Sequence, residues 1–393
     1  MQTGAVEAKG WTAPGFEGVR DAFERNFADD LETGAGFAAF RRDELVVDLW
    51  GGLADPRTDR PWERDTLALV FSTTKGITAM CANRLAETGA LDLTAPVVDV
   101  WPEFAAADKA SITVAQLLTH EAGLAWVDTP LTLEQALTWT PMVDALAAQA
   151  PHWVPGSAHG YHAVTYGYLV GEVIRRATGR SVGTYLRDEI AEPLGLDFWI
   201  GLPEEHEPRV ARLVGSGRDR GGERTDAVGA LEKMFGPEAN VVKALTAGGS
   251  FADPGLWNTR AVHAAEVPSA GGVGDARSVA RAYAACIGAV GGFRLFGDAT
   301  QREASRQHTT GNDVVLLDLD LQFGLGFIVP STLVTMGRPG SFGHFGLGGS
   351  MGWADPEAEL AFGYVMNRLA VGVTGDKRSN RLVRACYDAL DRV

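Results

Sequence analysis

The sequence predicts an α+β protein, an α/β sandwich whose sheet is built from both ends of the chain, with flanking terminal helices and a large, mostly helical insertion. Three observations support this prediction. A helix and a hairpin pattern open the chain, helical patterns dominate its middle, and strand-like runs and a helix close it. Because no low-complexity linker separates these parts, we expect a sheet domain of residues 1–70 and 271–393 and a helical domain of residues 71–270.

The N-terminal part carries one helix and one hairpin. Apolar side chains recur three and four positions apart in residues 16–30, which is typical of an amphipathic helix. Two apolar runs, at residues 36–40 and 45–50, flank a short polar segment and predict paired strands. The pair Gly51-Gly52 then ends the second strand.

The middle of the chain is mostly helical. An Ala- and Leu-rich stretch from Phe71 to about Thr88 predicts a long helix, which Gly89 ends as a C′ glycine. Residues 90–270 alternate helical patterns with loops rich in Gly, Pro and Trp, and few segments resemble strands. The helical patterns lie at residues 111–119, 132–149, 165–178 and 182–191.

The C-terminal part returns to the sheet. Residues 275–290 have helical spacing of apolar side chains, and Ser379 to Leu390 predict a closing helix. Strand-like runs lie between these helices, at residues 323–329, 342–346, 350–355 and 360–366.

Composition narrows the classes of function. The 393 residues include 35 Lys plus Arg against 50 Asp plus Glu, a formal net charge of −15, and no basic patch gathers in the sequence. Nucleic acid and anionic membranes are therefore not expected as partners. The three cysteines are far apart and form no CxxC motif, which favours a reducing compartment. We find no secretory signal pattern and no apolar run of membrane-spanning length, so we expect a soluble, cytoplasmic protein.

No metal or cofactor is expected either. His120-Glu121 lacks a second histidine four residues on, and His152, His159 and His162 lack ligand spacing with a carboxylate partner. The glycine-rich segments contain neither a Walker A sequence nor a GxGxxG joining a strand to a helix.

Ser72 and Lys75 form the first pattern with chemical content. They place a hydroxyl and an amine three residues apart at the start of a helix, so both can project from one face. A serine hydroxyl needs a base, and an amine crowded by apolar walls can be neutral enough to help. The helix start adds backbone N–H groups where an oxyanion would form. The pattern alone also fits an N-cap serine followed by a surface lysine.

Further short motifs accompany this pattern in a fixed order. They are Phe71-Ser72-Thr73-Thr74-Lys75, Leu117-Leu118-Thr119-His120-Glu121-Ala122-Gly123-Leu124, Pro155-Gly156 ahead of Tyr161, Pro193-Leu194-Gly195-Leu196, Gly271-Gly272-Val273 and Gly343-His344-Phe345-Gly346. The set resembles the serine β-lactamase and penicillin-binding-protein superfamily, and most closely its class C-like carboxylesterases, the family VIII esterases. The resemblance covers about residues 34 to 390. It implies a β-lactamase-like antiparallel sheet, with the active site between the two domains.

The resemblance implies a role for three side chains. Ser72 would be the acylated nucleophile, with Lys75 and Tyr161 as the bases of a proton relay. A phenol can accept the serine proton if a cationic field lowers its pKa from about 10. The nearby His159, Tyr166 and Tyr168 compete with Tyr161 for this role, and a core or cleft-lining position for Tyr161 is the simpler alternative.

The same resemblance implies the surroundings of the reacting carbonyl. His344 would orient or polarise the tyrosine or the substrate, and Gly346 would let the acyl chain pass close to its strand. The backbone N–H of Leu347, with that of Ser72, would form the oxyanion hole. For the substrate pocket we predict three aromatic residues, Trp126, Trp153 and Phe345.

A second serine motif lies close by. Ser350 stands in a GxSxG sequence, the nucleophile elbow of α/β-hydrolases, where a helix follows the serine and Asp and His follow later. Here a strand-like run follows, and no histidine occurs after His344. We therefore expect Ser350 not to be the nucleophile.

These observations favour a serine carboxylesterase that hydrolyses small, short-chain esters without a cofactor. A β-lactamase or D-alanyl-D-alanine peptidase is the first alternative. It is disfavoured because Ala163 stands where the family's Tyr-x-Asn motif has an amide, and because no export signal is found. The second alternative is a catalytically silent scaffold, which would have no physical need for the serine, lysine, tyrosine and histidine together. The sequence leaves the oligomeric state open.

Overall fold

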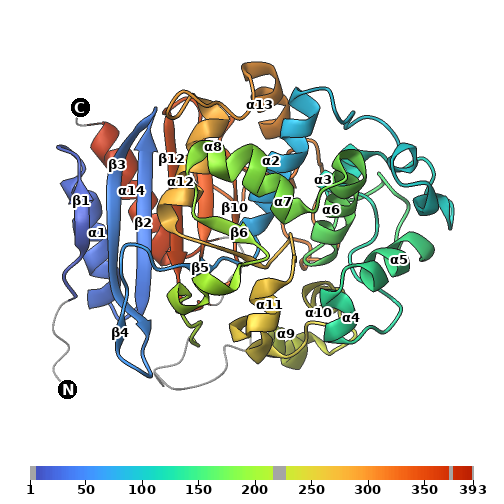
Figure 1. Cartoon of the computed structure of the whole chain (residues 1–393), viewed down its shortest axis with the longest axis horizontal. Helices are drawn as coiled ribbons and strands as arrows, with labels where there is room; N and C mark the ends of the chain where they lie inside the picture. The colour runs from blue at the N-terminus through green and yellow to red at the C-terminus, as the bar shows by residue number, and fades with distance from the viewer. Residues whose placement is uncertain (1–5, 216–226, 371–374, 392–393) are drawn as a thin grey trace.

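A nine-stranded antiparallel sheet organises the protein. The computed structural model describes residues 6–215, 227–370 and 375–391 (Figure 1). The strand order is β1-β3-β2-β12-β11-β10-β9-β8, with β4 paired to β3. The bounds are β1 (Lys9–Thr12), β2 (Gly34–Arg41), β3 (Glu44–Asp55), β4 (Arg60–Pro61), β8 (Gln322–Phe323), β9 (Ile328–Val329), β10 (Phe342–Phe345), β11 (Met351–Asp355) and β12 (Leu360–Met366).

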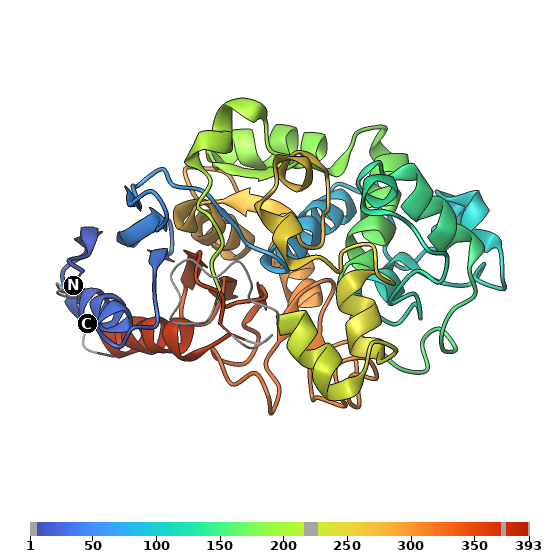
Figure 2. The same cartoon turned by 90° about the horizontal axis from the view of Figure 1, so that it is seen from below.

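The two ends of the chain meet at the centre of this sheet. β2 pairs with β12 from Ala35 opposite Met366 to Arg41 opposite Leu360. α1 (Glu17–Ala28) and α14 (Lys377–Leu390) pack against each other on one face (Figure 2). α12 (Ala276–Ile287) packs on β2, β11 and β12. It lies so close that a Cβ at Gly363 would meet the Ala276 carbonyl oxygen at 2.3 Å. The predicted α+β class is confirmed.

The remaining helices gather beside the sheet. α2 (Thr73–Glu87) packs against α6, α7 and β10, and every residue from Thr73 to Asn83 is buried. The other helices are α3 (Val114–Leu118), α4 (Leu133–Leu137), α5 (Thr140–Ala148), α6 (Thr165–Thr178), α7 (Val182–Leu186), α8 (Glu192–Leu194), α9 (Ala227–Phe235), α10 (Asn240–Thr246), α11 (Arg260–Ala264) and α13 (Asp298–Ser305). Short 3₁₀ turns join several of them. The proposed division into two domains stays a prediction.

The structure differs from the sequence prediction in several places. The second strand of the hairpin, β3, continues through Gly51-Gly52 to Asp55 instead of ending at this glycine pair. The expected helix at residues 132–149 is broken at Trp139, which has a φ of +70° between α4 and α5. The expected strand at residues 323–329 is two short strands, β8 and β9, joined by a turn. A three-stranded sheet of β5 (Ala68–Leu69), β7 (Gly272–Gly274) and β6 (Phe198–Ile200) was not expected. Its strands have two or three residues, too few for a visible alternation of side chains.

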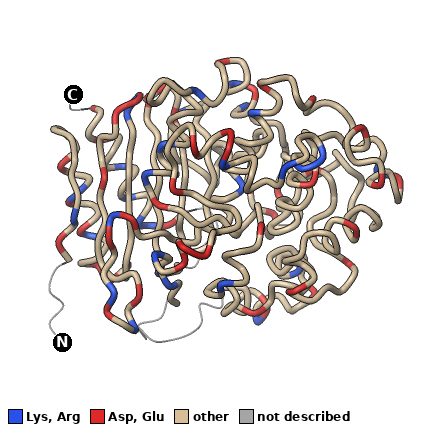
Figure 3. Tube along the Cα trace, in the orientation of Figure 1, with Lys and Arg blue, Asp and Glu red and all other residues tan. Residues whose placement is uncertain are grey.

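Charged residues are distributed without a track of one sign. Along the described part of the chain, positions of Lys and Arg are interspersed with those of Asp and Glu (Figure 3). Several ionisable side chains are nevertheless deeply buried, and Arg378 is one of them. Arg378, with 3% of its side chain exposed, donates to Glu32 at 3.1 Å, to Asp376 and to the Gly348 carbonyl at 2.5 Å. Burial raises the pKa of Glu32 to about 7, against the opposing effect of Arg378.

We expect Arg378→Ala to lower the free energy of unfolding by about 3–5 kcal/mol, because it leaves the buried Glu32 without its cation. The matched control is Arg42→Ala, which breaks an exposed ion pair with Glu359 and should cost at most about 1 kcal/mol. Urea denaturation followed by circular dichroism measures both. Equal losses in the two variants would contradict this account of Arg378.

Candidate active site

Ser72 lies at a sharp turn from strand to helix. It follows β5 by three residues and caps the N-terminus of α2. The preceding residue, Phe71, has a φ of +46°, a strained conformation for a side chain of this size. Packing holds Phe71 there, since its ring is buried edge-on to Trp257 at 5.1 Å. Ser72 is thereby presented, half-buried, at the wall of a cavity.

Lys75 lies one turn further along α2 and is fully buried. Its Nζ is 3.1 Å from Ser72 Oγ. It donates to the backbone carbonyls of Ala163 at 2.5 Å and Ser269 at 3.0 Å. Burial lowers the pKa of Lys75 well below its usual value. A neutral amine has two protons and one lone pair, so the two carbonyls take the protons and the lone pair is left for Ser72.

The structure brings Tyr161 to the same serine. Its hydroxyl lies close enough to the Ser72 side chain for that contact to oppose the rise of its pKa, and Lys75 Nζ lies 4.7 Å from the centre of its ring. Burial raises the pKa of Tyr161 above its usual value, so the phenol keeps its proton at neutral pH. Burial therefore disfavours the charged form of both groups beside Ser72, the phenolate of Tyr161 and the ammonium of Lys75.

The three competitors for this place are directed elsewhere. Tyr168 donates to the Ala136 carbonyl at 3.0 Å, and His159 Nε2 lies 2.9 Å from the Leu321 carbonyl. Tyr166 approaches Lys75, with Nζ 5.9 Å from its ring centre, and its hydroxyl has no partner among the described residues. None of these side chains is hydrogen-bonded to Ser72 in the described structure.

The end of β10 forms the opposite wall. Gly346 follows this strand, and a Cβ there would lie 2.1 Å from both Ser350 Oγ and the Val70 carbonyl, so only glycine fits. Leu347 lines the same cavity as Ser72. The ring of His344 is 6.1 Å from that of Tyr161, and its Nδ1 is bonded to the Phe345 carbonyl at 2.8 Å. Burial lowers the pKa of His344 to about 3, which keeps it neutral.

This geometry agrees with the comparison to known proteins. The sequence matches the beta-lactamase family over residues 23–385. The chain belongs to the beta-lactamase family. A curated relative, Esterase/beta-lactamase LipL of Mycobacterium tuberculosis, is 35% identical over 364 residues, which are 91% of this chain and 82% of LipL.

Solved structures of this beta-lactamase family are similar over almost the whole chain. A family VIII carboxylesterase has a TM-score of 0.87 and 38% identity, covering 98% of this chain and 100% of that one. A penicillin-binding protein homolog from Caulobacter crescentus has a TM-score of 0.83 and 39% identity, covering 97% and 99%. EstA from Arthrobacter nitroguajacolicus Rue61a has a TM-score of 0.84 and 35% identity, covering 97% and 98%. The expected family is confirmed, and the chain is a hydrolase of the beta-lactamase fold.

The walls of the cavity beside Ser72 differ from the sequence prediction. Trp126 lines a neighbouring, larger cavity instead. Phe345 stacks on Trp353 in the core, with ring centres 5.5 Å apart, and Trp153 packs against His162. The described apolar walls come from other residues, which are Phe71, Ala163, Val164, Leu213, Val214, Val228, Leu245, Phe251, Ala252, Pro254, Trp257, Ala270, Leu347 and Leu369.

Ser350 supports the turn that carries Ser72. Its buried Oγ donates to the Val70 carbonyl at 2.6 Å and is 3.0 Å from Thr73 Oγ1. A strand, β11, follows it where a nucleophile elbow requires a helix. The GxSxG motif of this beta-lactamase family protein is therefore a structural element.

Three further features of the structure concern possible metal ligands, membrane-spanning helices and the cysteines. Within the described ranges no group of three or more His, Cys, Asp or Glu side chains is placed to hold a metal ion. No helix described here is both long and apolar enough to cross a membrane. The three cysteines are buried and unpaired.

The lowered pKa of Lys75 predicts a pH dependence. The rate at which a fluorophosphonate labels Ser72 should stay high at neutral pH and fall as the pH drops through the depressed pKa, because the protonated amine cannot accept the serine proton. Lys75→Arg, which is always protonated, should slow labelling by about 10²–10⁴-fold. Thermal melts report whether the variant is folded. Labelling of folded Lys75→Arg within threefold of wild type would exclude Lys75 as the base.

Proposed function

We propose that the protein is a serine carboxylesterase that hydrolyses small carboxylic esters through an acyl-enzyme on Ser72. One observation carries the proposal: Ser72 Oγ is in reach of both the Lys75 amine and the Tyr161 phenol, at the wall of an apolar cavity. The names of the similar proteins, among them a family VIII carboxylesterase and an esterase/beta-lactamase, support it.

Acylation begins with the proton of Ser72. The lone pair of neutral Lys75 accepts this proton as Oγ attacks the ester carbonyl, and Lys75 becomes an ammonium beside the Tyr161 ring. The negative charge that develops on the carbonyl oxygen is stabilised by the backbone N–H groups of Ser72 and Leu347. Neither N–H donates to another group within the described residues, so both are available.

Collapse of the tetrahedral intermediate needs a proton for the leaving alcohol. The Tyr161 phenol donates its proton to the departing oxygen, and the Lys75 ammonium returns one to the phenolate. The products are the free alcohol and the Ser72 acyl ester, with both bases in their starting states. In deacylation a water takes the place of the alcohol, and the same two groups move its proton in the reverse sense.

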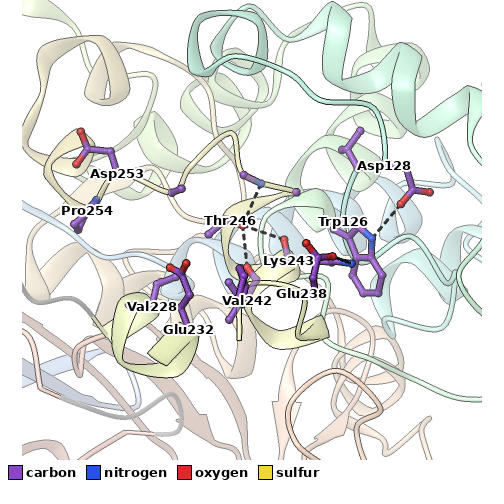
Figure 4. A pocket seen from close by; sticks show the side chains of 16 residues that line it. Trp126, Asp128, Val228, Glu232, Glu238, Val242, Lys243, Thr246, Asp253 and Pro254 are labelled. Atoms are coloured by element: carbon purple, nitrogen blue, oxygen red, sulfur yellow. Dashed lines mark hydrogen bonds and ion pairs between the residues drawn. The ribbon is translucent and has the colours of Figure 1, made fainter. Parts of the chain in front are cut away.

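Two adjoining cavities set the size of the substrate. The cavity beside Ser72 is about 60 Å³, with no charged side chain among its described lining residues. At about 10–15 Å³ for each water-sized group, it holds a short acyl or alkoxy group. The outer cavity is about 630 Å³ and shares Val228, Ala252 and Pro254 with it (Figure 4). We infer that one half of the ester is short and the other extends into the outer cavity.

The alternative of a β-lactamase or D-alanyl-D-alanine peptidase is favoured by the names of similar proteins, the relative LipL and the penicillin-binding protein homolog. Against it, Ala163 offers a methyl group and a carbonyl already bonded to Lys75, so it has no side-chain amide for a β-lactam substituent. The scaffold alternative gives no reason why the side chains of Lys75 and Tyr161 both lie next to Ser72.

The nucleophile is tested by comparing Ser72→Ala with Ser350→Ala. We expect Ser72→Ala to lose at least about 10³-fold of p-nitrophenyl acetate hydrolysis and all fluorophosphonate labelling. Ser350→Ala should keep both within about tenfold, because its hydroxyl supports the turn and touches no substrate.

The same assay distinguishes the alternatives. Mass spectrometry of the labelled protein locates the adduct, and circular dichroism checks folding. Loss of labelling in Ser350→Ala alone would overturn the assignment of Ser72. Nitrocefin turnover that rivals ester turnover would favour the β-lactamase, and no adduct on any serine would favour the scaffold.

The passage between the cavities is tested at Ala252, which is exposed and lines both. Ala252→Phe should lower kcat/KM by about tenfold or more for one of two long esters, ethyl octanoate or octyl acetate, because the ring narrows the passage. Ethyl acetate should react within twofold of wild type. Titration of the released acid at constant pH measures all three.

Ala105→Phe is the control, since Ala105 is exposed and lines neither cavity. Equal effects of Ala252→Phe on short and long esters would exclude the outer cavity as part of the substrate site.

A further inference from the structure

Tyr161 belongs to a segment without regular secondary structure, so its position depends on bonds to the backbone around it. Residues 158–162 form neither helix nor strand. The N–H of Gly160 donates to the His120 carbonyl at 3.0 Å, and the N–H of His162 donates to His120 Nδ1 at 3.1 Å. Between them, the N–H of Tyr161 faces the Asp313 carboxylate. His120 thus binds the backbone on both sides of Tyr161.

His120 is itself rigidly held. It is 1% exposed and has a φ of +62°, a left-handed conformation that is unfavourable for a residue other than glycine. Its ring lies 4.5 Å from Phe323 and 5.1 Å from both Tyr161 and Tyr166, measured between ring centres. Strain that persists in such tight packing is a feature of functional sites.

The acceptor at Nδ1 requires a neutral imidazole. A protonated ring would carry N–H at both nitrogens and could not accept from His162. Burial, with the neighbouring His162 and Lys75, lowers the pKa of His120 well below its usual value. His120 therefore stays an acceptor at neutral pH, and neither a phenylalanine nor a leucine in this place could replace it.

From this geometry we infer that His120 is a positioning residue for the reaction: its carbonyl and Nδ1 fix the backbone on both sides of Tyr161 and so hold the phenol against Ser72. The inference rests on the proposed function, since it needs Tyr161 to move the proton. His120 touches no substrate in this account. A displacement of about 1 Å in a group that transfers a proton can cost about 10²-fold in rate.

The test compares His120→Leu with His120→Asn. The two side chains have the same shape, but only asparagine has an oxygen near the place of Nδ1, and asparagine also tolerates the left-handed backbone. We expect His120→Leu to lose about 10²-fold in kcat for p-nitrophenyl acetate and in the rate of Ser72 labelling, with KM within threefold. His120→Asn should recover to within about fivefold of wild type.

Asn83→Leu is the matched control. Asn83 is also a fully buried polar residue, but its amide donates to the carbonyls of Ala79 at 2.8 Å and Leu325 at 3.0 Å and not to the Tyr161 segment. It should lose similar thermal stability and keep its kcat within threefold.

A double-mutant cycle that combines His120→Leu with Tyr161→Phe gives the decisive measurement. If His120 acts through Tyr161, His120→Leu should add less than threefold to the loss already caused by Tyr161→Phe. Fully additive losses, a folded His120→Leu enzyme with wild-type kcat, or an equal loss in Asn83→Leu would each overturn the inference. Should His120→Leu fail to fold, His120→Gly removes the acceptor without backbone strain and takes its place. An inactive, unlabelled wild type would instead refute the proposed function.

Discussion

The burial of the Lys75 amine beside Ser72 is the constraint on which the rest of the site depends. Burial removes the Lys75 amine from water and lowers its pKa, so the amine loses its proton more easily. Among the described residues, its hydrogen-bond partners besides Ser72 are two backbone carbonyls. The two carbonyls, of Ala163 and Ser269, come from segments more than 100 residues apart. The amine is held in place only when these segments and α2 are all packed together. The position of the proposed base is therefore a product of tertiary structure.

Burial shifts the pKa values of the groups around Lys75 as well. Burial lowers the pKa of His120, His162 and His344 and raises that of Tyr161, so in each case the neutral form is favoured. In the proposed reaction, a proton would pass along short contacts between neutral donors and acceptors, and charge would develop only when Ser72 reacts. Under this proposal, the positions of the groups would matter more for the rate than ion pairing.

Many of the helices and strands, and the closeness of Ser72 and Lys75, could be predicted from local sequence. The hairpin, the long helix after Phe71 and the last strands have clear periodicity, and Ser72 and Lys75 are close because they share one helix. The cavity walls could not be predicted, since Leu213, Trp257 and Leu369 come from three separate segments. Trp126 and Trp153 precede the tyrosine motif in the sequence, but this proximity does not determine which cavity their side chains line. Phe345 offered a signal: neighbours on a strand face opposite ways, so it could not share the face of His344.

Two strained residues explain how a site of neutral groups keeps its geometry. Phe71, before the nucleophile, and His120, beside the Tyr161 segment, both have left-handed backbones that their side chains disfavour. Each is held by aromatic packing, on Trp257 and on Phe323 respectively. The packing energy of the interior thus maintains local conformations that the chain would otherwise leave. Because that packing admits few alternative arrangements, the cavity beside Ser72 stays narrow. Under the proposed function, the same rigidity would position the bases and favour a substrate with a short group.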